Sequence, residues 1–202
     1  MNQSVEFFSR QFERQIAAAD YQLNPFERQV LPHLRGHVLE LGCGLGNLSL
    51  AAARRGHAVT AMDACEHAVA DLQRRAKDEF LTLQVQQCEL SRWRATSAYD
   101  SVVSIGLLMF FSCAEADRVL TEMQCATAAG GILAVNVLIE GTTFLDMFEP
   151  GRYCLFDDSA LLARFASWHL LEHQVQDFAA GAGRVKRFST VIAERRPNGD
   201  GG

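Results

Sequence analysis

Three glycines follow an acidic residue at regular spacing in the run Glu40-Leu41-Gly42-Cys43-Gly44-Leu45-Gly46-Asn47. Apolar residues precede the acid, and the pattern of residues 47–55 is typical of a helix. Glycine is needed where the backbone takes positive φ or must approach a ligand without a Cβ in the way. The run therefore predicts a strand that leads into a nucleotide-binding turn, with the N-terminus of the next helix facing the ligand.

A second acidic residue, Asp63, ends the next β-like run, residues 58–63. It follows the first glycine by about twenty residues, the separation of a carboxylate that accepts hydrogen bonds from both hydroxyls of a ribose. The alternative is that Asp63 caps the helix that starts near Cys65, and the two roles are compatible. A dinucleotide fingerprint needs its third glycine where this chain has Asn47, so the spacing disfavours NAD.

The order Glu-x-Gly-x-Gly-x-Gly resembles motif I of the class I S-adenosylmethionine-dependent methyltransferases, in which the glycines bed the methionyl part of the cofactor. The resemblance implies S-adenosyl-L-methionine as cofactor and S-adenosyl-L-homocysteine as product. It also implies a set of cofactor-binding residues, namely Glu40, Gly42, Cys43, Gly44, Gly46, Asn47, Asp63, Ala64, Glu89, Leu90 and Ile105.

Glu89 and Leu90 belong to that set because residues 87–93 resemble the family's Asp-Leu-x-x-Trp adenine-binding turn. In the family the acid receives the adenine amino group, and the next backbone amide reaches a ring nitrogen. Glutamate in place of aspartate adds a methylene, which displaces the carboxylate. The alternative for Glu89 is a solvated acid in a loop, and Trp93 is more typical of a core or rim aromatic.

The methyl acceptor is expected beyond the fourth strand, because the family's methyl group points toward that segment, here residues 104–111. The segment lacks an Asn/Asp-Pro-Pro-Tyr/Phe sequence, which would resemble the signature of amino-group methyltransferases that act on bases and glutamine. Methylation of DNA bases is therefore disfavoured. A sulfonium methyl is already activated, so alignment and water exclusion are the main tasks and few catalytic residues are required, and whether a general base is used stays open. The acceptor-site candidates are Tyr21, Leu107, Met109 and Arg152. Aromatic packing for Tyr21, core packing for Met109 and an exposed surface position for Arg152 are the alternatives.

Length and charge bound the organisation. With 202 residues, 49% of them hydrophobic, the chain can build one well-buried core, so we expect one methyltransferase domain over residues 1–196. Residues 1–34 are expected to be a helical extension that serves as a lid, and residues 197–202 a disordered tail. The net charge of −5 disfavours nucleic-acid and anionic-membrane partners.

The cysteines and histidines predict neither disulfides nor a metal site. The six cysteines have no Cys-x-x-Cys spacing, which favours reduced thiols and a cytoplasmic protein. His169 and His173 are four residues apart but lie in a strand-like segment, so no metal is expected. The N-terminal residues lack a signal-peptide pattern, and no run of about eighteen apolar residues occurs, so no membrane association is expected.

Strand and helix patterns alternate along the chain, which predicts an α/β fold with a doubly wound, mostly parallel sheet. Gly130-Gly131 is expected to break the chain before a buried strand at 132–139, and residues 168–178 and 186–194 to form an antiparallel pair. Such a pair ends the family's seven-stranded sheet. The compact size most resembles the small-molecule branch that includes the TehB-like methyltransferases.

The function expected is therefore methyl transfer from S-adenosylmethionine to a small-molecule acceptor. The alternatives are a methyltransferase acting on a protein or RNA, a non-catalytic S-adenosylmethionine-binding module, and a nucleotide-dependent oxidoreductase. The identity of the acceptor, the atom methylated and the oligomeric state stay open.

Overall fold

The computed structural model describes residues 3–197, and the side chains from Glu6 onward. Of the expected C-terminal tail, only Pro197 lies within the described residues. The helices are α1 (Gln3–Ala17), α2 (Pro25–Val30), α3 (Asn47–Arg54), α4 (Glu66–Asp78), α5 (Cys113–Ala126) and α6 (Asp158–Ala163). The strands are β1 (His37–Leu41), β2 (Ala58–Asp63), β3 (Leu83–Gln87), β4 (Tyr99–Ile105), β5 (Thr127–Leu138), β6 (His169–Ala179) and β7 (Val185–Glu194).

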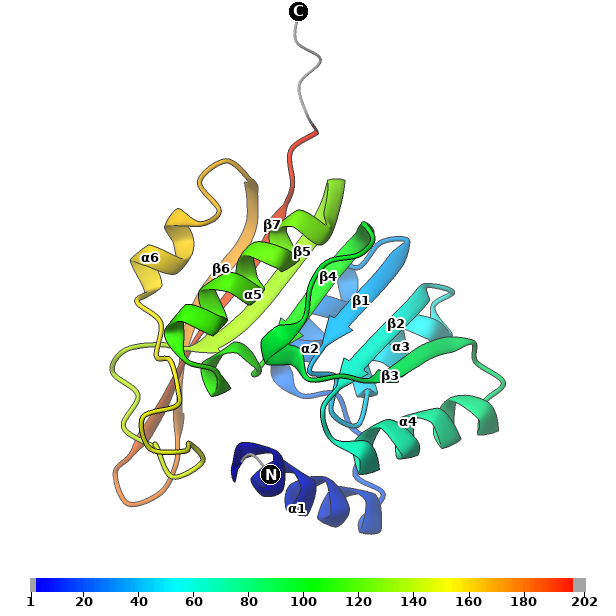
Figure 1. Cartoon of the computed structure of the whole chain (residues 1–202), viewed down its shortest axis with the longest axis horizontal. Helices are drawn as coiled ribbons and strands as arrows, with labels where there is room; N and C mark the ends of the chain where they lie inside the picture. Colours follow the sequence, from blue (N-terminus) through cyan, green and yellow to red (C-terminus); the bar gives the residue numbers. More distant parts are fainter. Residues whose placement is uncertain (1–2, 198–202) are drawn as a thin grey trace, which may run out of the picture.

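The strands form one seven-stranded sheet in the order β3-β2-β1-β4-β5-β7-β6 (Figure 1). Strands β1 to β5 run parallel, and β7 runs antiparallel to both β5 and β6. The predicted mostly parallel sheet and its terminal antiparallel pair are therefore confirmed.

Helices cover both faces of the sheet, as a doubly wound fold requires. On one face, Val30 of α2 and Leu48 of α3 pack against Val38 and Ala134, and α4 adds Leu72. On the opposite face, side chains of α5 and α6 pack against alternate residues of the same strands. Buried apolar side chains on both faces explain why the central strands read as nearly continuous apolar runs.

The strand order reverses between β1 and β4, and ligands of open α/β sheets bind at such a switch point, beyond the carboxyl ends of the strands. The glycine run follows β1, and Gly106 follows β4, so both loops lie at this point. In Figure 1, α1 crosses below this end of the sheet. The topology thus brings the first helix of the chain to the ligand-binding edge.

Two element boundaries differ from the sequence predictions. Strand β5 begins at Thr127 and runs through Gly130-Gly131, because Gly130 takes a φ of +74° and Gly131 has backbone oxygens where a Cβ would lie. The second helix of the extension expected over residues 1–34, α2, ends at Val30, and the chain continues as a 3₁₀ turn, Leu31–His33. Pro32 in this turn has no N–H to continue the α-helical ladder.

One disulfide joins Cys113, the first residue of α5, to Cys154 in the irregular segment between β5 and α6. The prediction that all six cysteines are reduced is therefore wrong for this pair, because the fold brings together two residues 41 positions apart. Disulfides are rare in the cytosol, so the pair removes the support that the cysteines gave to a cytoplasmic location. Within residues 3–197, no helix has the length and apolarity to cross a bilayer.

Glu40, near the end of β1, is buried, with 3% of its surface exposed. The Ser49 hydroxyl of α3 donates a hydrogen bond to its carboxyl group, which links the strand to the helix that follows. Burial raises the pKa of Glu40 to about 8, and the nearby Glu27 and Asp63 carboxylates add to the rise. Ionising this group inside the fold therefore costs free energy at neutral pH.

We predict that Glu40→Gln becomes progressively more stable than the wild type as pH rises. The pKa of Glu40 in the folded state lies above its value in the unfolded state, so below about pH 4.5 the group does not lower the free energy of unfolding. Between there and about pH 8, the free energy of unfolding of the wild type falls by up to roughly 1.4 kcal/mol per pH unit. Urea unfolding at pH 5, 6, 7 and 8 measures the difference. Glu66→Gln, an exposed change on α4, is the control and should follow the wild type. Parallel stability curves for Glu40→Gln and wild type would contradict the prediction.

Candidate active site

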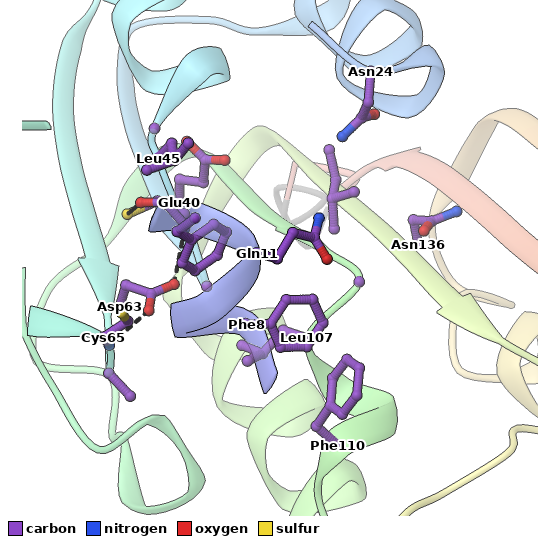
Figure 2. Close-up of a pocket in the computed structure, with 18 of the residues that line it drawn as sticks. Phe8, Gln11, Asn24, Glu40, Leu45, Asp63, Cys65, Leu107, Phe110 and Asn136 are labelled. Carbon is purple, nitrogen blue, oxygen red and sulfur yellow. Dashed lines mark hydrogen bonds between the residues drawn. The ribbon is translucent and has the colours of Figure 1, made fainter. Parts of the chain in front are cut away.

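A cavity of about 460 Å³ opens at the switch point, between the glycine run, α1 and the ends of β4 and β5 (Figure 2). This volume lies in the range of small-ligand sites. The cavity is lined by every residue predicted to bind the cofactor, namely Glu40, Gly42, Cys43, Gly44, Gly46, Asn47, Asp63, Ala64, Glu89, Leu90 and Ile105. Of the acceptor candidates, Leu107 and Met109 also line it.

The glycine run forms a tight turn whose shape depends on the missing side chains. The N–H groups of Gly42 and Cys43 both donate to the carbonyl oxygen of Met62, which holds the turn against the end of β2. Gly44 has a φ of +51°, and a Cβ there would lie 2.9 Å from the ring of Phe12. Burial raises the pKa of the Cys43 thiol well above its usual range, so this thiol stays neutral.

Asp63 bridges two loops. One carboxylate oxygen accepts a hydrogen bond from the Gly44 N–H and the other from the Cys65 N–H, each at 2.8 Å. Burial raises the pKa of Asp63, and these two hydrogen bonds oppose the rise. A carboxylate has about four acceptor positions, so capacity for two hydroxyl donors is left. Asp63 does not cap α4 through its side chain in the usual way, since the N-cap residue is Cys65, and the ribose role stays a prediction.

Glu89 and Leu90 lie together at the start of a short 3₁₀ turn, Leu90–Arg92. The Glu89 carboxylate caps this turn by accepting hydrogen bonds from the Ser91 N–H and hydroxyl. Glu89 is exposed, whereas Leu90 is buried in the core. Both line the cavity, and their contact with an adenine ring stays a prediction.

Helix α1 supplies one wall of the cavity through Phe8, Gln11, Phe12 and Gln15. The Phe8 ring packs edge-to-face on Phe110, with centroids 4.9 Å apart, which joins α1 to the segment after β4. Phe12 packs against Leu45 and Cys65 near the glycine run. Figure 2 shows Phe8 and Gln11 in the middle of the site, between Asp63 and Asn136.

Tyr21, a predicted acceptor-site residue, does not line the cavity. The guanidinium of Arg75 lies 4.0 Å above its ring, and its hydroxyl donates to Asp71 at 3.4 Å. These two residues of α4 draw the side chain away from the site. Arg75 also donates to the carbonyl of Leu45 and the side chain of Asn47, so Tyr21 packs behind the glycine run.

Arg152 is also absent from the cavity lining and is exposed. Its backbone N–H donates to the carbonyl of Glu149 in a turn, and its charge helps to lower the pKa of Glu115 at the start of α5. The segment that carries it contributes Met147 to the cavity instead. The position of Arg152 thus matches the surface alternative.

The end of the cavity away from Asp63 contains residues that the sequence did not single out. We call it the Asn136 end and define it by Asn24, Phe26, Glu27, Asn136, Met147, Lys186 and Phe188. Figure 2 shows Asn24 and Asn136 together on this side, with Asp63 and Cys65 on the other. Asn136 had one sequence signal, since it is the polar residue within the apolar run 132–139. Lys186 had none, because its position depends on how β7 pairs.

The Asn136 end contains two aromatic rings, those of Phe26 and Phe188. The Phe26 ring lies 4.9 Å from Phe188, and Phe188 pairs with Leu138 across β5 and β7. Cys154, which forms the disulfide with Cys113, also donates its N–H to the carbonyl of the cavity residue Met109. This end thus combines apolar walls with four polar side chains, and such a combination suits a small molecule.

Known proteins share both the sequence pattern and the fold. A family model described as "Methyltransferase domain" matches residues 38–131. The probable S-adenosyl-L-methionine-dependent methyltransferase TehB of Haemophilus influenzae is 25% identical over 166 residues, which are 79% of this chain and 57% of that protein. This chain therefore spans little more than half the length of that relative.

Solved structures agree on the fold. The crystal structure of TehB from Haemophilus influenzae matches with a TM-score of 0.75 and 20% identity, over 86% of this chain and 63% of that one. The N-methyltransferase NodS from Bradyrhizobium japonicum, solved with S-adenosylhomocysteine, matches with a TM-score of 0.69 and 16% identity, over 93% and 98% of the two chains. The glycine run, Asp63 and the sheet order thus occur together with a methyltransferase-domain match over residues 38–131, and in sequence and fold the chain is similar to the TehB-like class I S-adenosylmethionine-dependent methyltransferases.

Proposed function

We propose that this protein transfers a methyl group from S-adenosylmethionine to a small-molecule acceptor. The observation that carries the proposal is the single cavity whose two ends differ in chemistry. One end has the glycine run and Asp63, which suit a nucleoside cofactor, and the Asn136 end has aromatic walls that suit a compact acceptor.

The charges around the cavity fit the cofactor. Glu27, Glu40 and Asp63 all line it, and burial raises the pKa of each. Desolvated carboxyl groups gain stability as anions when a cation comes close. S-adenosylmethionine supplies an activated methyl on a sulfonium and carries an ammonium group, so its charge complements these residues.

The residues of the chain then have three tasks. The glycine run and Asp63 fix the cofactor, Leu107 and Met109 form the apolar surface next to the methyl, and α1 excludes water through Phe8 and Phe12. Alignment of acceptor and methyl within about 3–3.5 Å, in a site without water, is sufficient for a large part of the rate enhancement. In this proposal α1 serves as the lid of a catalytic domain over residues 1–196.

The alternative acceptors are a protein or an RNA. A polymer would have to reach the Asn136 end past α1, whose Phe8 is packed on Phe110. The net charge of −5 also gives no general attraction for RNA. Both observations favour a small acceptor. A binding module without catalysis would share the cofactor end, so only turnover separates it from an enzyme.

We predict that S-adenosylhomocysteine stabilises the wild type and that Asp63→Ala weakens its binding about tenfold or more. At a hundredfold excess over Kd, binding adds about 2.7 kcal/mol, which raises the Tm by roughly 5–11 °C for a domain of this size. Removing the carboxylate loses charge-assisted hydrogen bonds worth about 1.5–3 kcal/mol. Calorimetric titration measures the affinities. Asp78→Ala, an exposed change on α4, should bind like the wild type, and NAD should give no shift. Unchanged affinity in Asp63→Ala would leave Asp63 with a structural role only.

We predict that transfer of labelled methyl goes to small molecules and not to polymers. Purified protein with methyl-labelled cofactor is incubated separately with a metabolite extract, total RNA and a protein extract, and each fraction is counted. Phe8→Ala should lower the rate by about tenfold or more, because loss of the contact with Phe110 admits water to the methyl. Phe80→Ala, which removes an aromatic ring that is 96% exposed, is the control. Label confined to RNA or protein would refute the small acceptor, and no label anywhere would favour the binding module.

A further inference from the structure

Asn136 has an unpartnered oxygen in the cavity lining. Its side chain is 1% exposed, and its Nδ2 donates to the Thr190 hydroxyl at 2.9 Å. Its Oδ1 has no hydrogen-bond partner among the residues with described side chains. A buried polar atom without a partner costs free energy, so Oδ1 calls for a donor. A hydrogen-bond donor on a ligand in the cavity would satisfy this oxygen while Thr190 holds the rest of the amide.

The position of Asn136 relates this oxygen to the methyl. Asn136 on β5 pairs with Ile105 at the end of β4, and its carbonyl accepts a hydrogen bond from the Gly106 N–H at 2.9 Å. The acceptor candidate Leu107 comes next along the chain. A ligand group that donates to Asn136 is therefore held beside the segment where the acceptor is expected.

Lys186 is a cation in the same end of the cavity. Its Nζ lies 4.6 Å from the centre of the Phe144 ring. Arg184 lies on the same ring, but Asp146 neutralises it through two contacts of 2.7 Å. No acidic side chain among those described forms an ion pair with Lys186, and burial lowers the pKa of its ammonium. Lys186 thus lines the cavity, and its partly desolvated ammonium, which lies over the Phe144 ring, would be stabilised by an anion.

The same end also has apolar walls, beside the polar side chains of Asn24 and Glu27. Phe26, Phe188 and Met147 lie there, and Phe188 is two residues from both Lys186 and Thr190 along β7. A hydrated inorganic oxyanion would gain nothing from these rings, whereas an organic body would bury apolar surface against them.

We propose that the Asn136 end binds an acceptor with an apolar body, a carboxylate that pairs with Lys186, and a hydroxyl or amine that donates a hydrogen bond to Asn136. The acceptor class is therefore a compact hydroxy- or amino-carboxylic acid. This inference rests on the proposed function, because it gives the acceptor class for the same cavity.

The test compares binding of matched probes to the protein saturated with S-adenosylhomocysteine. The probes are the three hydroxybenzoate isomers, phenol, which lacks the carboxylate, and benzoate, which lacks the donor. At least one hydroxybenzoate should bind about tenfold or more tightly than both partial analogues, as expected for a hydrogen bond to a charged group and for one to a buried oxygen. Calorimetric titration gives each affinity.

Two variants separate the two contacts. Lys186→Gln should remove the preference for hydroxybenzoate over phenol, and Asn136→Leu the preference over benzoate. Arg187→Gln is the matched control, because Arg187 neighbours Lys186 but pairs with Asp177 and does not line the cavity. Circular dichroism and S-adenosylhomocysteine binding check the fold of the Asn136 variant. Lys186→Gln keeps the test valid if that variant does not fold.

Several outcomes would overturn the inference alone, provided that S-adenosylhomocysteine binds. They are hydroxybenzoates that bind no better than phenol, a carboxylate preference that survives in Lys186→Gln, and phosphate or selenite binding as tightly as the best hydroxybenzoate. A tenfold loss of S-adenosylhomocysteine affinity in Lys186→Gln would show that Lys186 binds the cofactor and not the acceptor. Absence of S-adenosylhomocysteine binding to the wild type would overturn the proposed function and this inference together.

Discussion

The site depends on one carboxylate, that of Asp63, which joins the loop after β1 to the loop after β2. Its two oxygens accept the N–H groups of Gly44 and Cys65, so both loops are fixed relative to each other before any ligand binds. The geometry is possible because parallel strands bring their carboxyl ends to the same edge, and because Gly44 adopts positive φ without a side chain. Loss of this bridge would leave the glycine run held by the carbonyl of Met62 and by the guanidinium of Arg75.

Behind the glycine run lies a second support with the opposite charge. Arg75 of α4 is buried, pairs with Asp71 at 2.9 Å, and donates to Leu45 and Asn47 of the run. The cationic support therefore acts from outside the loop, while the carboxyl groups of Glu40 and Asp63 line the cavity. The cavity lining thus has acidic groups at the expected cofactor end, and both the acidic Glu27 and the basic Lys186 at the Asn136 end.

The sequence was sufficient to predict features that depend on local pattern and chain order. The glycine run, the strand that ends at Asp63 and the antiparallel β6–β7 pair all have signals within a few residues, and the cavity is lined by the residues taken from them. Tyr21 failed as a cavity residue because Arg75 and Asp71, fifty or more positions away, determine where its ring packs. The placement of Lys186 in the cavity depends on the register of β7, and that of Glu27 depends on where α2 packs. No local sequence pattern gives either. The Cys113–Cys154 disulfide likewise depends on tertiary structure.

Two walls of the cavity differ in how they are held, and this difference indicates which one can move. The wall formed by the segment before α6 is tied to α5 by the disulfide and to Met109 by a backbone hydrogen bond. The opposite wall, α1, is held by side-chain packing, chiefly Phe8 on Phe110 and Phe12 on the glycine run. Packing of a few aromatic rings is weaker than a covalent link, and segments with few buried contacts open first. Entry and exit of ligands are therefore expected to take place by displacement of α1, while the sheet edge and the disulfide-linked wall keep the acceptor aligned with the cofactor.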